Sequence, residues 1–156
     1  MGLIGGGTPG FGEFIVIEGI TKAGVIDAVA SLFYQVSGDN AFLLYTLIVF
    51  ASVILSAFID NIPYVATMLP VVSSIAALMN GGAGMAPYVF YFGLLTGATL
   101  GGNLTPIGAS ANIAAIGILR KNGESVSTRD FLRIGVPFTL AAVLAGYIYI
   151  WLVWGM

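Results

Sequence analysis

The sequence predicts an all-α integral membrane protein, and two observations carry that prediction. Hydrophobic residues make up 58% of the 156 residues and charged residues only 8%, whereas soluble domains carry about 25% charged residues. The charges are also unevenly placed, because Asp60 is the only one between Asn40 and Leu119 and none follows Arg133. Charge-free stretches of this length are typical of membrane-spanning helices.

The composition also excludes several functional classes. A formal net charge of −2 without a basic patch excludes a nucleic-acid partner. The chain has no cysteine and no histidine, which excludes disulfides, thiol nucleophiles, histidine bases and ordinary zinc or haem sites. A lone intramembrane carboxylate does not build a hydrolase, so we expect neither an enzyme nor a cofactor. The lipid bilayer is the first expected partner.

We expect one membrane domain of roughly five or six segments. A Gly-rich, irregular start at 1–10 precedes a short span and an amphipathic interfacial helix within 11–39. A helical hairpin follows over 41–79, with its tip at 60–63. The final span, 134–154, ends in tyrosines and tryptophans of the kind that form an interfacial belt.

A broken helix is expected over 87–119. As one straight helix these 33 residues would extend roughly 50 Å, which exceeds the ~30 Å hydrocarbon core. Gly101, Gly102 and Pro106 interrupt the apolar pattern, because glycine permits non-helical angles and proline removes a hydrogen bond. We therefore place a break at 101–112.

The 120–133 segment is the only charge-dense loop, and it predicts both orientation and a helix start. The loop over 119–133 carries four basic residues, whereas the 20–39 segment has one. The positive-inside rule therefore places the 119–133 loop in the cytoplasm. We expect the chain to lie in an inner or plasma membrane. Ser127 with Asp130 marks the start of the last helix. Asn40 is a plausible N-cap for the helix that follows it.

The first candidate site is the turn between the hairpin arms, where Asp60, Asn61 and Pro63 lie between two very apolar segments. If the arms cross the membrane completely, this turn is a capped surface loop. If the hairpin is re-entrant, Asp60 and Asn61 lie at membrane depth, where a carboxylate normally faces a cation, a cavity or a proton path. The spacing leaves both interpretations open.

The second candidate site is the helix break. Small polar residues cluster there with freed backbone groups, and together they can coordinate an ion or substrate: Asn103, Thr105, Gly108, Ser110 and Asn112. The N-terminus of the second half-helix favours an anion. The alternatives are a plain loop between two short helices or close glycine packing between spans, but a Gly/Pro interruption with clustered polar groups favours a broken transporter helix.

Three stretches, Ser56–Pro63, Ala66–Pro70 and Gly101–Asn112, resemble the ion transporter superfamily. That superfamily includes arsenite efflux pumps, NhaD-type sodium–proton antiporters, citrate carriers, divalent-anion symporters and the melanosomal pink-eyed-dilution protein. The sequences of these stretches are most similar to the pink-eyed-dilution branch of the superfamily. The resemblance runs from about Phe11 onward and covers one repeat, similar to the C-terminal half.

The resemblance implies a transporter of two inverted repeats, each with a re-entrant hairpin and a discontinuous helix. Asp60 and Asn61 would then form the hairpin tip, and Thr105 with Pro106 would begin the unwound segment. A single repeat needs a partner, either as a homo-oligomer or as a hetero-oligomer with a chain that supplies the other repeat.

We therefore expect a secondary transporter, or half of one, that moves a small anion, metabolite or inorganic ion by alternating access. Na⁺ or H⁺ would be the coupling ion, with Na⁺ at Asp60, Asn61 and Asn112. The alternatives are a passive channel formed by oligomerisation and a non-transporting membrane subunit. Substrate, coupling ion and the choice between symport and antiport stay open.

Overall fold

The structure is a computed structural model and describes residues 24–80 and 88–156. In these ranges it contains helices and no strand. The helices are α2 (Val25–Ser37), α3 (Ala41–Ser56), α4 (Asn61–Asn80), α5 (Tyr88–Gly101), α6 (Ser110–Lys121) and α7 (Thr128–Ile150), and α7 continues as a π-helical turn, η1 (Trp151–Gly155). The expectations for 1–10 and for the short span that follows lie outside the described residues.

The helix starts follow the capping residues in the sequence. The Asn40 side chain accepts a hydrogen bond from the Leu43 amide at 3.0 Å, which caps α3. Ser127 and Asp130 form a reciprocal capping box at the start of α7, so the predicted helix start there is confirmed. Such a cap satisfies N–H groups that have no partner within the helix.

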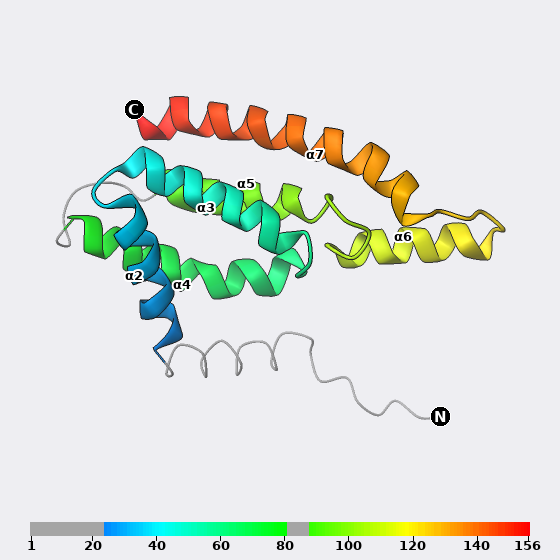
Figure 1. Ribbon diagram of the computed structural model, residues 1–156, viewed down its shortest axis with the longest axis horizontal. Helices are drawn as coiled ribbons and strands as arrows, with labels where there is room; N and C mark the ends of the chain where they lie inside the picture. Colours follow the sequence, from blue (N-terminus) through cyan, green and yellow to red (C-terminus); the bar gives the residue numbers. More distant parts are fainter. Residues whose placement is uncertain (1–23, 81–87) are drawn as a thin grey trace.

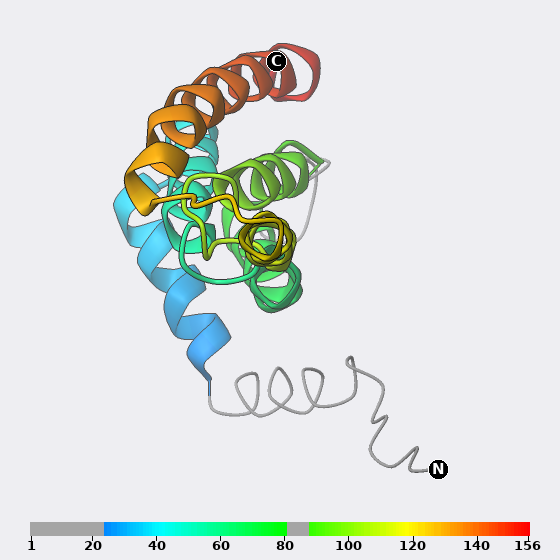
Figure 2. The same ribbon diagram turned by 90° about the vertical axis from the view of Figure 1, so that its right-hand side faces the viewer.

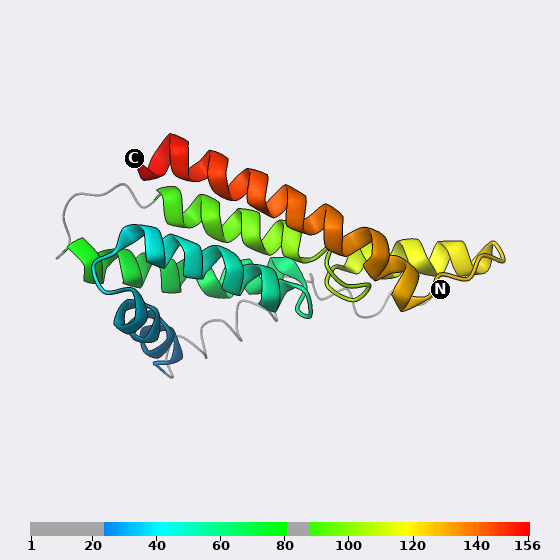
Figure 3. The ribbon, with the colours of Figure 1, turned by 45° about the horizontal axis from the view of Figure 1, so that its top comes forward.

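Helices α3, α4 and α5 run side by side, and α7 lies over α5, as Figures 1 and 3 show. Helix α2 crosses α3 and α4 at a steep angle, which is clearest in the end-on view of Figure 2. Helix α6 continues beyond α5 and projects past the α3–α4 hairpin (Figure 1). Within residues 24–80 and 88–156, two helices are long and apolar enough to cross a membrane, Asn61–Met79 and Thr128–Gly155.

Glycines bring α5 against α3. At Gly97 an added Cβ would lie 2.4 Å from the Val49 carbonyl oxygen, and at Gly101 it would lie 2.6 Å from the Val53 backbone. Gly93, one turn earlier, faces the Tyr45 ring, which would lie 2.6 Å from a Cβ at that position. Glycines four residues apart are the standard means of close helix approach in membranes. These three glycines therefore set the close approach of α5 to α3.

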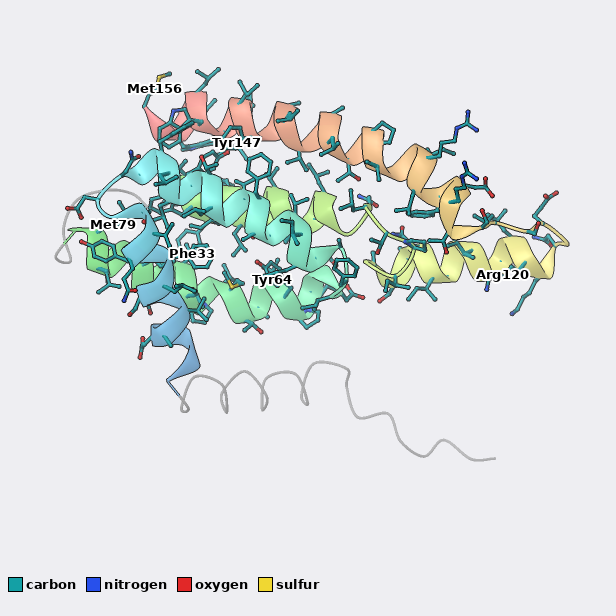
Figure 4. The ribbon with its side chains drawn as sticks, in the orientation of Figure 1. Phe33, Tyr64, Met79, Arg120, Tyr147 and Met156 are labelled. Atoms are coloured by element: carbon teal, nitrogen blue, oxygen red, sulfur yellow. The ribbon has the colours of Figure 1, made fainter. Side chains whose placement is uncertain are left out.

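An aromatic cluster joins α7 to α3 at the far end from the break. Tyr45 is fully buried and stacks on Tyr147 with ring centroids 5.0 Å apart. The Tyr45 hydroxyl donates to the Tyr147 carbonyl at 2.9 Å, and the Tyr147 hydroxyl shares a 2.7 Å hydrogen bond with Thr46. Tyr147 lies where α7 passes over α3 (Figure 4). This residue, expected as an interfacial anchor, therefore also fixes α7 to α3.

Candidate functional site

The hairpin turn lies slightly before its expected position. Helix α3 ends at Ser56 and α4 begins at Asn61, so the turn consists of 57–60 and not 60–63. Pro63 is in the first turn of α4, where its missing N–H costs nothing because first-turn amides have no partner within the helix. Asp60 is therefore the residue directly before the helix and is half-buried.

The helix break is shorter than the sequence predicted. Helix α5 ends at Gly101 and α6 begins at Ser110, so the break spans 102–109 and contains Gly102 and Pro106. The Asn112 side chain explains why α6 starts early, since its amide nitrogen donates to the carbonyls of Gly102 at 2.9 Å and Thr105 at 3.2 Å. Asn112 thereby ties the first turn of α6 to the break.

The hairpin turn and the helix break meet in one place, which we call the joint: Ala57, Asp60, Thr105, Gly108 and Ser110. The Ser110 amide donates to Asp60 Oδ2 at 3.2 Å, and the Ser110 hydroxyl donates to the same oxygen. The Thr105 hydroxyl donates to the Ala57 carbonyl. A Cβ at Gly108 would lie 2.9 Å from the Ala57 carbonyl oxygen, so only glycine permits this approach.

Two buried hydroxyls support the joint, although neither residue was predicted as part of a site. Ser56 donates to the Ala98 carbonyl at 2.6 Å, which binds the end of α3 to α5. Tyr64 donates to Ser52 at 3.0 Å, which binds α4 to α3, and it lies between these helices in Figure 4. The sequence did contain a signal for these two residues, namely a hydroxyl group in an otherwise apolar helix. A buried hydroxyl group needs a hydrogen-bond partner.

Two predicted residues lie outside the joint. Asn103 lines a cavity between the break and α7, whose Gly135 backbone closely approaches the Asn103 carbonyl. Asn61 lines a different, mostly apolar hollow on the other side, together with Thr99. The structure thus brings Asp60, Thr105, Gly108, Ser110 and Asn112 together and separates Asn61 and Asn103 from them.

The joint has a defined electrostatic character. Ser110 is the first residue of α6, so the Asp60 carboxylate lies at the positive end of that helix dipole. The anion expected at this helix terminus is therefore a side chain of the chain itself. The oxygen atoms that could bind a cation here belong to carboxylate, amide and carbonyl groups, which Na⁺ and other hard cations prefer as ligands. Among the described residues no cluster of three acidic or histidine side chains is present.

The comparisons with known proteins agree with this architecture. Residues 11–155 match a family model described as a citrate transporter. An uncharacterized transporter of Mycobacterium tuberculosis is 40% identical over 141 residues, which cover 90% of this chain and 32% of the relative. An uncharacterized transporter of Synechocystis is 32% identical over 152 residues, which cover 89% of this chain and 34% of that relative.

A third relative is the P protein of Mus musculus, which is 34% identical over 142 residues, covering 88% of this chain and 17% of that protein. The chain spans about a third of the length of the bacterial transporters that it matches. Its apolar helices and this family match indicate an integral membrane protein. The chain therefore belongs to the citrate transporter family, in agreement with the ion transporter superfamily that its motifs resemble.

Proposed function

We propose that this chain forms one half of a secondary transporter that couples the movement of a small anion to Na⁺ or H⁺ by alternating access. The observation that carries the proposal is the Asp60 carboxylate on the first amide of α6, where Ser110 donates through both its N–H and its hydroxyl. A helix N-terminus is an anion-binding site. Here an ionisable side chain occupies it.

This arrangement gives the coupling a physical basis. While Asp60 is ionised, its charge balances the positive end of α6 and competes with any other anion. A proton or Na⁺ on the carboxylate neutralises that charge and weakens its hold on Ser110. The α6 terminus then becomes available to a substrate anion. Cation binding and anion binding therefore favour each other, which is the requirement for symport.

The substrate we propose is a small carboxylate such as citrate, the compound in the family description. Between Lys22 and Arg120 the sequence contains no basic residue. A carboxylate substrate would therefore be held by the helix terminus, backbone amides and the coupling cation. Of the two asparagines expected at a Na⁺ site with Asp60, Asn112 would add its side-chain oxygen, whereas Asn61 lines a separate hollow.

The length of one hairpin arm, α3, supports a re-entrant hairpin, whereas the other arm, α4, is long enough to cross a membrane. Helix α3 has 16 residues, about 24 Å, which is short of the ~30 Å hydrocarbon core. Along the direction of α7, the hairpin turn lies between the two ends of that helix (Figure 3). Helix α7 together with η1 forms a helical run of 28 residues. With α7 across the bilayer, the joint lies within it, and the basic loop at 119–133 lies on the cytoplasmic side.

The surface around the joint supports a partner. Five large apolar side chains that flank the turn and the break are between 46% and 69% exposed: Phe58, Ile59, Ile62, Ile107 and Ile113. An exposed apolar group around a polar centre is typical of an interaction surface. We propose that the other repeat, in the same polypeptide or in a second chain, covers this surface.

A thermal-shift panel on the detergent-purified chain tests the coupling. Citrate, succinate, sulfate and arsenite are each added with and without Na⁺ or Li⁺ and at stepped pH. A ligand at ~100 times its dissociation constant adds about 2.7 kcal/mol of stability. We expect a citrate shift that requires Na⁺ or low pH in the wild type. In Asp60→Asn, which is permanently neutral, we expect the shift to occur without the cation.

Asp39→Asn is the matched control, because Asp39 is an exposed acid bonded to Tyr34 and lies away from the joint. It should keep the wild-type dependence on cation. A citrate shift in Asp60→Asn that still needs Na⁺ would contradict the coupling role. A folded wild type that responds to no ligand would contradict a site formed by this chain alone.

A further inference from the structure

A second cavity lies on the α7 side of the break. Its volume is about 550 Å³, within the ~300–1,000 Å³ of ligand sites. Apolar side chains from α6, the following loop and α7 line it, among them Leu119, Phe131, Ile134 and Phe138. Its polar lining residues are Asn103, Ser125 and Asp130. Nothing in the proposed coupling at Asp60 uses this cavity.

The mouth of this cavity is charged. A neighbouring hollow of about 480 Å³ shares Ser125, Val126 and Asp130 with the cavity and adds Arg120 and Glu124. Arg120 lies toward the end of α6 (Figure 4). Ser125, Val126 and Asp130 border both spaces, so the apolar cavity lies directly beside a cation and two carboxylates.

We propose that this cavity, together with the hollow at its mouth, binds a phospholipid whose headgroup carries a phosphate and a primary ammonium, as in phosphatidylethanolamine. Arg120 takes the phosphate, and Glu124 and Asp130 take the ammonium. Asp130 uses only Oδ2 for the capping box with Ser127, which leaves Oδ1 for the headgroup. One acyl chain enters the apolar cavity.

The dimensions fit a lipid. From Asp130 to Phe138 the cavity follows α7 for eight residues, about 12 Å, close to the ~15 Å depth of one leaflet. The occupant must be apolar over this depth and charged at one end only, which describes an amphiphile. Helix α6 has no buried residue, so an acyl chain between α6 and α7 would also supply the packing that α6 otherwise lacks.

Native mass spectrometry of the detergent-purified chain tests this proposal. The protein is exchanged with equal amounts of phosphatidylethanolamine, phosphatidylcholine and phosphatidylglycerol. We expect one phosphatidylethanolamine to bind preferentially, because a quaternary ammonium donates no hydrogen bond and a glycerol headgroup carries no cation. Arg120→Gln should reduce its binding at least about fivefold through loss of a charge-assisted contact. Ile134→Trp should reduce it similarly by filling the cavity.

Arg133→Gln is the control, because it removes the same charge near the start of α7, and Arg133 lines neither the cavity nor the hollow at its mouth. It should leave lipid binding unchanged. Equal binding of the three lipids, or equal losses in Arg120→Gln and Arg133→Gln, would overturn the headgroup assignment. Full binding in a folded Ile134→Trp would show that the lipid binds outside this cavity and would overturn the proposal. None of these readouts depends on Asp60 or on transport.

Discussion

Helices α5 and α6 are two parts of one interrupted helix, yet their surroundings differ completely. Seven residues of α5 are buried, three of them glycines that contact α3, whereas α6 has no buried residue. Both helices are rich in apolar residues. Hydrophobicity therefore does not decide which one packs. In a membrane, apolar side chains gain little free energy by leaving lipid. Close approach of the helix backbones therefore determines which helices pack together.

The position of the glycines explains the contrast. Gly97 lies against the α3 backbone. At Gly117, the single glycine of α6, an added Cβ would meet no atom of another described element within 4 Å. Helix α5 is therefore packed within the described residues, whereas α6 is not. Under the two proposals above, lipid and the other repeat would cover the exposed surface of α6.

Shortening an apolar side chain should give the largest difference between the two helices. Leu94 on α5 is 0% exposed and Ile118 on α6 is 61% exposed. We expect Leu94→Ala to lower the free energy of unfolding by about 2–5 kcal/mol because it leaves a cavity. Ile118→Ala should change it by less than about 0.5 kcal/mol. Reversible unfolding in detergent measures both, and comparable losses would mean that α6 is packed in solution.

Adding a single methyl group should act in opposite directions on the two helices. Gly97→Ala places a Cβ 2.4 Å from the Val49 carbonyl oxygen, so α3 and α5 must separate, at a cost of about 1–3 kcal/mol. Gly117→Ala meets open space and should stabilise α6 by about 0.5–1 kcal/mol through helix propensity. The same unfolding assay compares them. A stabilising Gly97→Ala would show that the α3–α5 contact is not close.

The smallest expected effect concerns α7 where it passes over α5. Thr139 is fully buried, and its hydroxyl has no hydrogen-bond partner among the described residues. Thr139→Val keeps the shape and removes the unpaired group, so we expect stability to rise by about 1 kcal/mol. Thr67→Val is the matched control, because the Thr67 hydroxyl donates to the Pro63 carbonyl at 2.9 Å and should show no gain. A loss in Thr139→Val would reveal a partner for this hydroxyl.

Much of the local structure could be predicted from the sequence. Asn40 and the Ser127–Asp130 pair cap the helices that they were expected to start. Glycine and proline located the interruption between Gly101 and Ser110, although its end lay earlier than expected. These features depend on residues a few positions apart, so residue type and spacing are sufficient to predict them.

The arrangement of the candidate site was less predictable. Asn103 and Thr105 are two positions apart in the same break, but one lines the cavity toward α7 and the other bonds to the hairpin turn. Which way each faces depends on contacts such as that between Gly135 and the Asn103 backbone. The Ser56–Ala98 bond, across 42 positions, likewise depends on how α3 meets α5.

The joint also imposes an order on biosynthesis. Asp60 and Ser110 are 50 positions apart, and Ala57 and Thr105 are 48 apart. At a synthesis rate of roughly 5–20 residues per second, Ser110 emerges about 3–10 s after Asp60. During that interval the hairpin exists without the partner of its carboxylate. In the re-entrant arrangement proposed above, the nascent chain must keep Asp60 hydrated or protonated until α6 arrives, and a helix that is made later completes the insertion of the hairpin.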